Sequence, residues 1–332
     1  MSTESSGVAD SKEGFESLQL PSMAPGSLVR HFGPGMILMM TGIGTSHLVT
    51  APVAGGRFGF ALLWCLPIAY IFKYYGFEMA FRFTNATGRS LLDAYSTAWK
   101  KWPVWYVLIT TIIQSAIGQA GRLIAAAAVL FYIFREYVGV DIPGLGDNAE
   151  LGLYGFVLGA SSVAIILGGK YGAVELVTKI AAGILVVCSF GVYFVAPAPI
   201  AEFVHFFQLD TPEGSWLIIA SFLGLLPTGI DVSLQASEWG KAKKTGMGRI
   251  REEMEAQGIA PRFNSFTSTK RDLTVDASRL PAHAQEYCRR WFKIALWDFR
   301  AGHVISFILA AIFLLLAAVC LFPSDVQGNA VM

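Results

Sequence analysis

Several stretches of about twenty residues in this sequence carry almost no charged side chains. The hydrocarbon core of a bilayer is about 30 Å thick, and a helix that rises 1.5 Å per residue needs about 20 apolar residues to cross it. Only 15% of the 332 residues are charged, whereas a soluble domain carries about 25%. The charges gather in the N-terminal tail and between residues 240 and 300. This distribution predicts an all-α polytopic membrane protein.

Seven stretches have the length and composition of a transmembrane helix, and we expect each to be one. They cover residues 33–60, 61–81, 104–134, 152–169, 173–196, 216–237 and 303–322. The domain organisation that follows from them is a disordered cytoplasmic tail (1–31), a membrane domain with spans one to six (32–239), a basic cytoplasmic loop (240–300), span seven (301–323) and a short extracytoplasmic end (324–332).

The distribution of lysine and arginine predicts the orientation of these spans, because cytoplasmic loops hold an excess of both. The connections after spans two, four and six are basic and include Lys100, Lys170 and a cluster between residues 241 and 290. The connection after span five, 197–215, contains no lysine or arginine. We therefore expect a cytoplasmic N-terminus and an integral, multi-pass protein of the plasma (inner) membrane. Within span two, Lys73 and Glu78 could snorkel or form ion pairs.

Spans one and six each combine helix-breaking residues with polar side chains. Residues 42–47 read Gly-Ile-Gly-Thr-Ser-His, and residues 226–231 read Leu-Pro-Thr-Gly-Ile-Asp. Broken backbone at membrane depth is tolerated only where it lines a polar cavity, and paired discontinuous helices indicate the midplane site of a transporter. We expect an oxygen-rich pocket suited to a hard cation. The candidate residues are Gly44, Thr45, Ser46, His47, Pro227, Thr228 and Asp231.

Each of these residues also has a purely structural interpretation. Proline-kinked helices that contain serine and threonine are ordinary in membranes, and Asp231 could simply neutralise Arg122 in span three. His47 could be a packed histidine with one hydrogen bond. A further polar set could either line a pathway or bond helices to one another: Gln114, Gln119, Arg122 and Gln235.

Several glycine-rich motifs lie at distances from one another that match those of a known protein family. Residues 33–35 (Gly-Pro-Gly) are followed by 54–60 (AGGRFGF) and 62–64 (LLW), residues 168–172 (GGKYG) lead to Glu175, and Leu226-Pro227 lies within span six. Together these motifs resemble the Nramp family of divalent-metal transporters over most of residues 33–322.

The resemblance implies an inverted-repeat fold of five plus five helices. It is incomplete here, with about seven transmembrane helices and with helices one and six broken. It also implies a divalent metal ion bound between the unwound stretches as the transported substrate, proton-coupled uptake, and no resident cofactor. The family's Asp-Pro-Gly-Asn motif falls at residues 44–47, its methionine at Leu226 and its carbonyl-donating residue at Leu223. Its acidic proton-network positions fall near Gln119 and Arg122.

These departures indicate a divergent, Nramp-related branch. Without the methionine, which favours soft transition metals, we expect a hard or O- and N-ligated metal such as Mg²⁺ or Mn²⁺, with weakened or rewired proton coupling. The family has ten or more spans, whereas this sequence stops after its seventh, so we expect a fragment of a longer reading frame.

Two other functions remain open from the sequence. One is transport of a small organic solute on the same fold, and the other is a non-transporting sensor or scaffold that acts through the 240–300 loop. The sequence has no His-rich metal constellation and no nucleophile elbow, so we do not expect an enzyme. The expected partners are the lipid bilayer and a divalent metal ion, with no nucleic acid.

Overall fold

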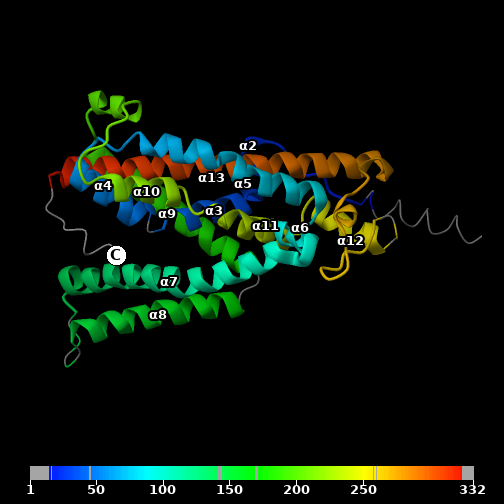
Figure 1. Cartoon of the computed structure of the whole chain (residues 1–332), viewed down its shortest axis with the longest axis horizontal. Coiled ribbons are helices and arrows are strands. Elements are labelled where there is room, and N and C mark those ends of the chain that lie inside the picture. The colour runs from blue at the N-terminus through cyan, green and yellow to red at the C-terminus, as the bar shows by residue number, and fades with distance from the viewer. Residues whose placement is uncertain are drawn as a thin grey trace, which may run out of the picture. The chain divides into compact units, whose positions relative to one another are not determined.

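The computed structural model describes residue 15 and residues 17–44, 46–140, 142, 144, 146–168, 171–256, 258 and 260–323. Every regular element in these residues is a helix, and the prediction of an all-α fold is confirmed (Figure 1). The chain divides into two compact units. Unit 1 comprises Met1–Lys101 and Thr178–Met332, and unit 2 comprises Trp102–Val177.

Within the described residues, four helices are long and apolar enough to cross a membrane. They are Trp99–Val138, Asp147–Gly168, Gly172–Val195 and Ala282–Cys320. The second predicted span is the 23-residue helix α5 (Cys65–Thr87), which carries Lys73, Glu78 and Arg82. The first and sixth predicted spans are divided into shorter helices, so neither forms one long apolar rod.

The first predicted span consists of α3 (Pro34–Gly42), the π-helical segment η1 (Ser46–Thr50) and α4 (Ala51–Phe58). The sixth consists of α10 (Trp216–Leu225) and α11 (Val232–Ala242). Leu226 is extended, with φ −88° and ψ 138°, which is the conformation that a following proline imposes. Both interruptions therefore lie where glycine and proline predict them.

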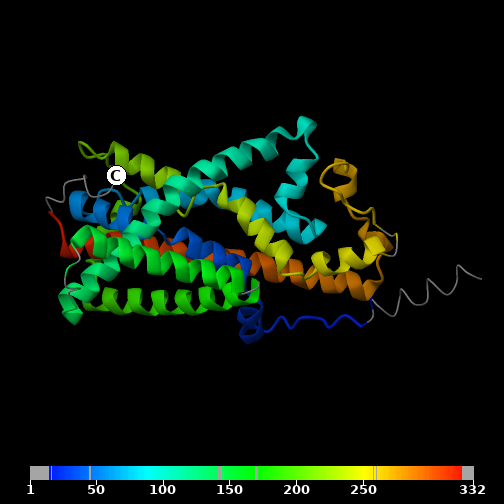
Figure 2. The same cartoon turned by 90° about the horizontal axis from the view of Figure 1, so that it is seen from below.

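The core of unit 1 forms around α13 (Ala282–Cys320), the 39-residue helix against which α3, α4 and α5 pack. Glycines allow two of these contacts to be close. A β-carbon built on Gly35 would lie 2.4 Å from the backbone carbonyl of Asp298, and one built on Gly55 would lie 2.2 Å from the carbonyl oxygen of Leu314. Figures 1 and 2 both show α3 and α5 running beside α13.

The segment between span six and span seven is also folded. It contains α12 (Met247–Ala256), the 3-10 turns η5 (Lys270–Leu273) and η6 (Ala277–Arg279), and the first half of α13. The sequence suggests a surface-seeking helix around residues 287–297. The structure instead joins this stretch to span seven in one rod, with Tyr287 and Ile294 buried.

Part of the expected N-terminal tail is ordered. Helix α2 covers Pro25–His31, and Phe15 and Leu18 are buried in a cluster with Ile250, Met254 and five other residues of the segment 247–287. The structure thus differs from the expectation of disorder for these residues, because two apolar side chains of the tail pack against apolar side chains of the segment 240–300, which we call the insert.

The remaining elements of unit 1 are short. They are α6 (Leu91–Ser96), η2 (Trp99–Lys101) and η4 (Ile200–Phe206). Unit 2 is built from α7 (Trp102–Tyr132), the π-helical η3 (Ile133–Val138), α8 (Asp147–Gly168) and the first residues of α9 (Tyr171–Val195). Helices α7 and α8 lie side by side, with Gly155 opposite Ala127. The rest of α9 belongs to unit 1, where Ala182 packs with Met39 and Leu309.

Candidate functional site

The interruptions of the first and sixth spans meet. A β-carbon built on Gly42, the last residue of α3, would lie 2.8 Å from the carbonyl oxygen of Pro227 and 3.8 Å from the hydroxyl oxygen of Ser306. Leu226, Pro227 and Thr228 are all buried at this point. The backbone of one interruption therefore lies directly against the backbone of the other, with α13 beside both.

His47 lies at the centre of a buried polar cluster next to this meeting point. Its Nε2 atom lies 2.8 Å from the hydroxyl of Tyr70, 3.1 Å from the hydroxyl of Ser306 and 3.2 Å from the carbonyl oxygen of Ser306. The two hydroxyls are 2.8 Å apart. Each of the three residues is at most 3% exposed. Such a cluster links η1, α5 and α13 through side chains that all offer nitrogen or oxygen.

Lys73 of α5 contacts the interruption of span six. Its ammonium group donates hydrogen bonds to the carbonyl oxygens of Gly224 (2.6 Å) and Thr228 (3.1 Å). It also interacts electrostatically with Asp231, the first residue before α11. The carbonyl groups freed by the break are thus partly directed at a cation that the protein itself supplies.

A carboxylate of α13 holds the start of α3. One oxygen of Asp298 accepts hydrogen bonds from the backbone N–H groups of Gly33 (2.9 Å) and Gly35 (2.8 Å), and the other accepts from Met36 (3.2 Å). The first N–H groups of a helix have no partner within the helix. Asp298, only 2% exposed, satisfies three backbone donors at once.

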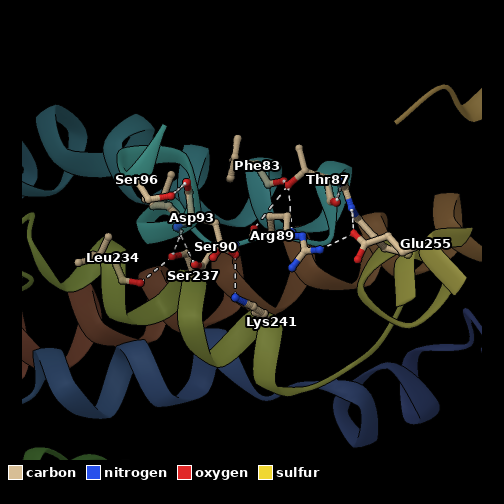
Figure 3. Close-up of polar contacts among 12 residues, drawn as sticks. Phe83, Thr87, Arg89, Ser90, Asp93, Ser96, Leu234, Ser237, Lys241 and Glu255 are labelled. Carbon is tan, nitrogen blue, oxygen red and sulfur yellow. Dashed lines mark hydrogen bonds and ion pairs between the residues drawn. The ribbon is translucent and has the colours of Figure 1, made fainter. Parts of the chain in front are cut away.

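Polar contacts also hold α11, the second half of span six. Lys241 pairs with Asp93 at 2.7 Å, and the hydroxyl of Ser237 accepts a hydrogen bond from the backbone of Leu91 at 3.0 Å (Figure 3). Asp93 also closes a capping box with Ser90 at the start of α6. Helix α11 is therefore anchored to the loop that follows α5.

The same loop is tied to the insert. Figure 3 shows Glu255 of α12 directed at Arg89, with which it forms an ion pair. The almost fully buried Arg251 donates to the carbonyl oxygens of Thr87 (3.0 Å) and Leu273 (2.8 Å). The insert is thus fastened to the end of α5 by charged groups with defined partners.

The structure buries some of the predicted candidates of spans one and six and leaves others exposed. His47, Pro227 and Thr228 are buried at the meeting point. Gly44 follows α3, and Ser46 begins η1. Thr45 lies outside the described residues. Asp231 is exposed and interacts electrostatically with Lys73. Leu223 is 39% exposed within α10, and Gln235 is exposed on α11.

The predicted polar set of span three lies in unit 2. Gln114, Gln119 and Arg122 are exposed on α7, and Arg122 donates a hydrogen bond to Gln119 at 3.1 Å. The alternative in which Asp231 neutralises Arg122 pairs residues of different units. Within each unit, Asp231 interacts with Lys73 and Arg122 with Gln119.

Three residues of this region are absent from the sequence-based candidates as site residues: Tyr70, Ser306 and Lys73. Tyrosine and serine are common in apolar helices, so neither carries a signal by itself. Lys73 does carry one, because a charged residue inside a span is costly and marks a functional hypothesis. Glu78, its companion in the sequence, instead forms ion pairs with Arg82 (3.2 Å) and Arg300 (3.1 Å).

The donors available at the meeting point are imidazole nitrogen, hydroxyl oxygen and backbone carbonyl oxygen. No group of three or more His, Cys, Asp or Glu side chains is arranged for a metal ion in the described part of the chain. A cation held here would therefore depend on carbonyl and hydroxyl oxygens, with His47 as the nitrogen donor and Asp231 as the nearby acid.

Comparison with known proteins adds two findings. A family model described as natural resistance-associated macrophage protein-like (Nramp) matches residues 35–331. A curated relative from Pasteurella multocida (strain Pm70), described as an uncharacterized protein, is 23% identical over 296 residues. The alignment covers 86% of this chain and 55% of the relative, so the chain spans about half the length of that relative.

Proposed function

Because this chain belongs to the Nramp family, we propose that it acts as a secondary active transporter that moves divalent metal cations into the cytoplasm. The low identity to its relative places it in a divergent branch of the family. The observation that carries the proposal is the contact between the two interruptions, where Gly42 of span one faces the carbonyl oxygen of Pro227 in span six.

The proposed cation site lies between these interruptions. Broken helices free backbone carbonyl groups, and in a membrane such groups are stable only against protein or a polar cavity. We propose that His47, Thr228 and the backbone of residues 224–228 supply the site's nitrogen and oxygen donors, because Gly42 lies close both to Pro227 and to Ser306, a partner of His47. Asp231 supplies the negative charge that a divalent cation requires there, once Lys73 no longer interacts with it.

The donor set supports a hard metal as the substrate. Leu226 stands where the family's methionine falls, so the sulfur that favours soft metals is missing from this position. Carbonyl, carboxylate and hydroxyl oxygens suit Mg²⁺ and Mn²⁺, and an imidazole nitrogen also coordinates Mn²⁺. We therefore propose Mg²⁺ or Mn²⁺ as the substrate, with proton coupling that is weakened or rewired.

Metal uptake into liposomes tests this function. We expect the purified chain to transport Mg²⁺ or Mn²⁺ at least as well as Cd²⁺, and Asp231→Asn and His47→Ala to reduce uptake about tenfold or more, which is about 1.4 kcal/mol. Glu213→Gln, which removes an exposed acid in the connection before α10, is the matched control and should leave uptake unchanged. Cd²⁺ uptake far above that of Mg²⁺ and Mn²⁺ would contradict the hard-metal assignment.

A second measurement tests the binding site independently of transport. Calorimetric titration with Mn²⁺ should show weaker binding to Asp231→Asn than to the wild type. An unchanged Mn²⁺ affinity would remove Asp231 from the site. A pH-sensitive dye inside the same liposomes reports whether protons move with the metal.

A further inference from the structure

We propose that Lys73 is a built-in cation that occupies the carbonyl groups of the span-six interruption when no metal is bound, and that the transported cation must displace it. This inference rests on the proposed function and adds a competing group to its site. It assigns a role to a charged residue of span two that the donor set above does not use.

The geometry places the ammonium group on carbonyl oxygens that the break leaves available. Gly224 lies in the last turn of α10, which ends at Leu225, and the last carbonyl groups of a helix have no N–H partner within it. Thr228 lies in the interruption itself. Both carbonyl oxygens accept hydrogen bonds from Lys73, at 2.6 and 3.1 Å. The C-terminal end of a helix also attracts positive charge.

Close packing holds α5 in the position that this contact requires. A β-carbon built on Gly76, one turn after Lys73, would lie 2.5 Å from the Cδ1 atom of Ile230 in the interruption. Residues three apart lie on the same side of a helix, so Lys73 and Gly76 face span six together. The side chain of Lys73 is thus directed at the interruption by the packing of α5.

Charge makes the ammonium group and a metal ion exclusive occupants of these oxygens. Like charges a few ångström apart repel strongly in a medium of low dielectric constant. Lys73 also interacts with Asp231, the acid assigned to the metal. The two carbonyl oxygens are therefore bonded to Lys73 while the site is free of metal, and the carboxylate of Asp231 attracts the same ammonium group.

This arrangement favours divalent over monovalent cations. Replacing the ammonium group by Na⁺ exchanges one positive charge for another and gains little from Asp231 and the carbonyl dipoles. Replacing it by Mn²⁺ adds a second charge, which strengthens both attractions. Lys73 therefore raises the affinity that a cation must have for Asp231 and the carbonyl oxygens in order to enter the site.

The test measures Mn²⁺ binding to the whole chain by calorimetry in four variants. Lys73→Met removes the charge and keeps the length of the side chain, and we expect it to bind Mn²⁺ at least tenfold more tightly than the wild type. Lys73→Arg keeps the charge and should bind no more tightly than the wild type. Lys293→Met removes an exposed lysine of α13 and controls for the change in net charge. In Lys73→Met, Na⁺ should also compete with Mn²⁺ more effectively.

Lys73→Gln is the fourth variant, and it serves as a second uncharged variant in case Lys73→Met misfolds. Its amide can still donate to the carbonyl oxygens without a charge, and its thermal unfolding in detergent should match that of the wild type. An unchanged or weaker Mn²⁺ affinity in folded Lys73→Gln or Lys73→Met would overturn the inference.

The outcomes separate this inference from the proposed function. If the wild type binds Mn²⁺ and Asp231→Asn weakens that binding, while loss of the Lys73 charge has no effect, the function stands and the inference fails. If only the variants without the Lys73 charge bind Mn²⁺, the inference is supported. If no variant binds Mn²⁺, both fail.

Discussion

Gly42 is the residue at which the backbone of span one comes closest to that of span six. In Gly42→Ala, the new β-carbon would lie 2.8 Å from the carbonyl oxygen of Pro227, a contact that backbone atoms can relieve only by moving apart. We expect the substitution to destabilise the protein by about 1–3 kcal/mol and to weaken Mn²⁺ binding. Thermal unfolding in detergent and calorimetry measure the two effects.

Gly183→Ala is the matched control for that substitution. Gly183 lies in α9, and a β-carbon built on it would meet nothing within 4 Å. Alanine is favoured over glycine in a helix by about 1 kcal/mol, so stability should be unchanged or slightly higher. If Gly42→Ala behaved like Gly183→Ala, the two interruptions would not be in contact.

Some residues of this candidate site could be predicted from the sequence, and others could not. His47 and Pro227 could be predicted because a polar or helix-breaking residue within an apolar stretch is locally unusual. Tyr70 and Ser306 could not, because each is an ordinary member of its helix until the fold brings it within 3.1 Å of His47 or of the other hydroxyl. The electrostatic interaction of Asp231 with Lys73 likewise depends on how α5 packs.

At the scale of the element, the start of α3 depends on a residue more than 260 positions away in the sequence. In Asp298→Asn, one carboxylate oxygen becomes an amide group, which cannot accept a hydrogen bond from a backbone N–H. We expect a loss of about 1–3 kcal/mol, because buried backbone donors are left without partners. Thermal unfolding measures the loss, and faster hydrogen exchange at residues 33–36 would locate it.

Asp276→Asn offers a comparison of the same chemistry at the surface. Asp276 accepts a hydrogen bond from the backbone N–H of Ser278 at 3.1 Å in an exposed 3-10 turn. Water can replace this bond, so its loss should have a small effect on stability. Equal effects of the two substitutions would show that burial of Asp298 is unimportant to α3.

The interruptions of spans one and six could be predicted because glycine and proline act on the backbone locally. The continuity of α13 could not. Its first half carries Arg289, Arg290 and Lys293, whereas its second half is apolar, so composition places the two halves in different environments and suggests separate helices. Only packing shows one rod, in which Tyr287 and Ile294 are buried on one side.

At the scale of the whole molecule, an N-terminal segment and the insert share one apolar cluster. Phe15 and Leu18 are 2% and 4% exposed and pack with Met254 and Tyr287. The ring of His283 lies 2.7 Å from the carbonyl oxygen of Leu18. The sequence predicts that both segments are cytoplasmic, and two segments on one side of a bilayer are joined by a chain that crosses it an even number of times. The six predicted spans between them satisfy this condition.

Cysteine labelling from outside intact cells tests this topology. In a variant without the four native cysteines, we expect Ser22→Cys and Ser265→Cys to be protected from a membrane-impermeant maleimide, because both positions are exposed on the proposed cytoplasmic side. Glu213→Cys, in the connection that contains no lysine or arginine, should react at once. Permeabilising the cells should make all three react and provides the control. Labelling of residue 22 without residue 265 would contradict the placement of both segments on one side of the membrane. Reversal of all three results would contradict the orientation that the basic residues predict.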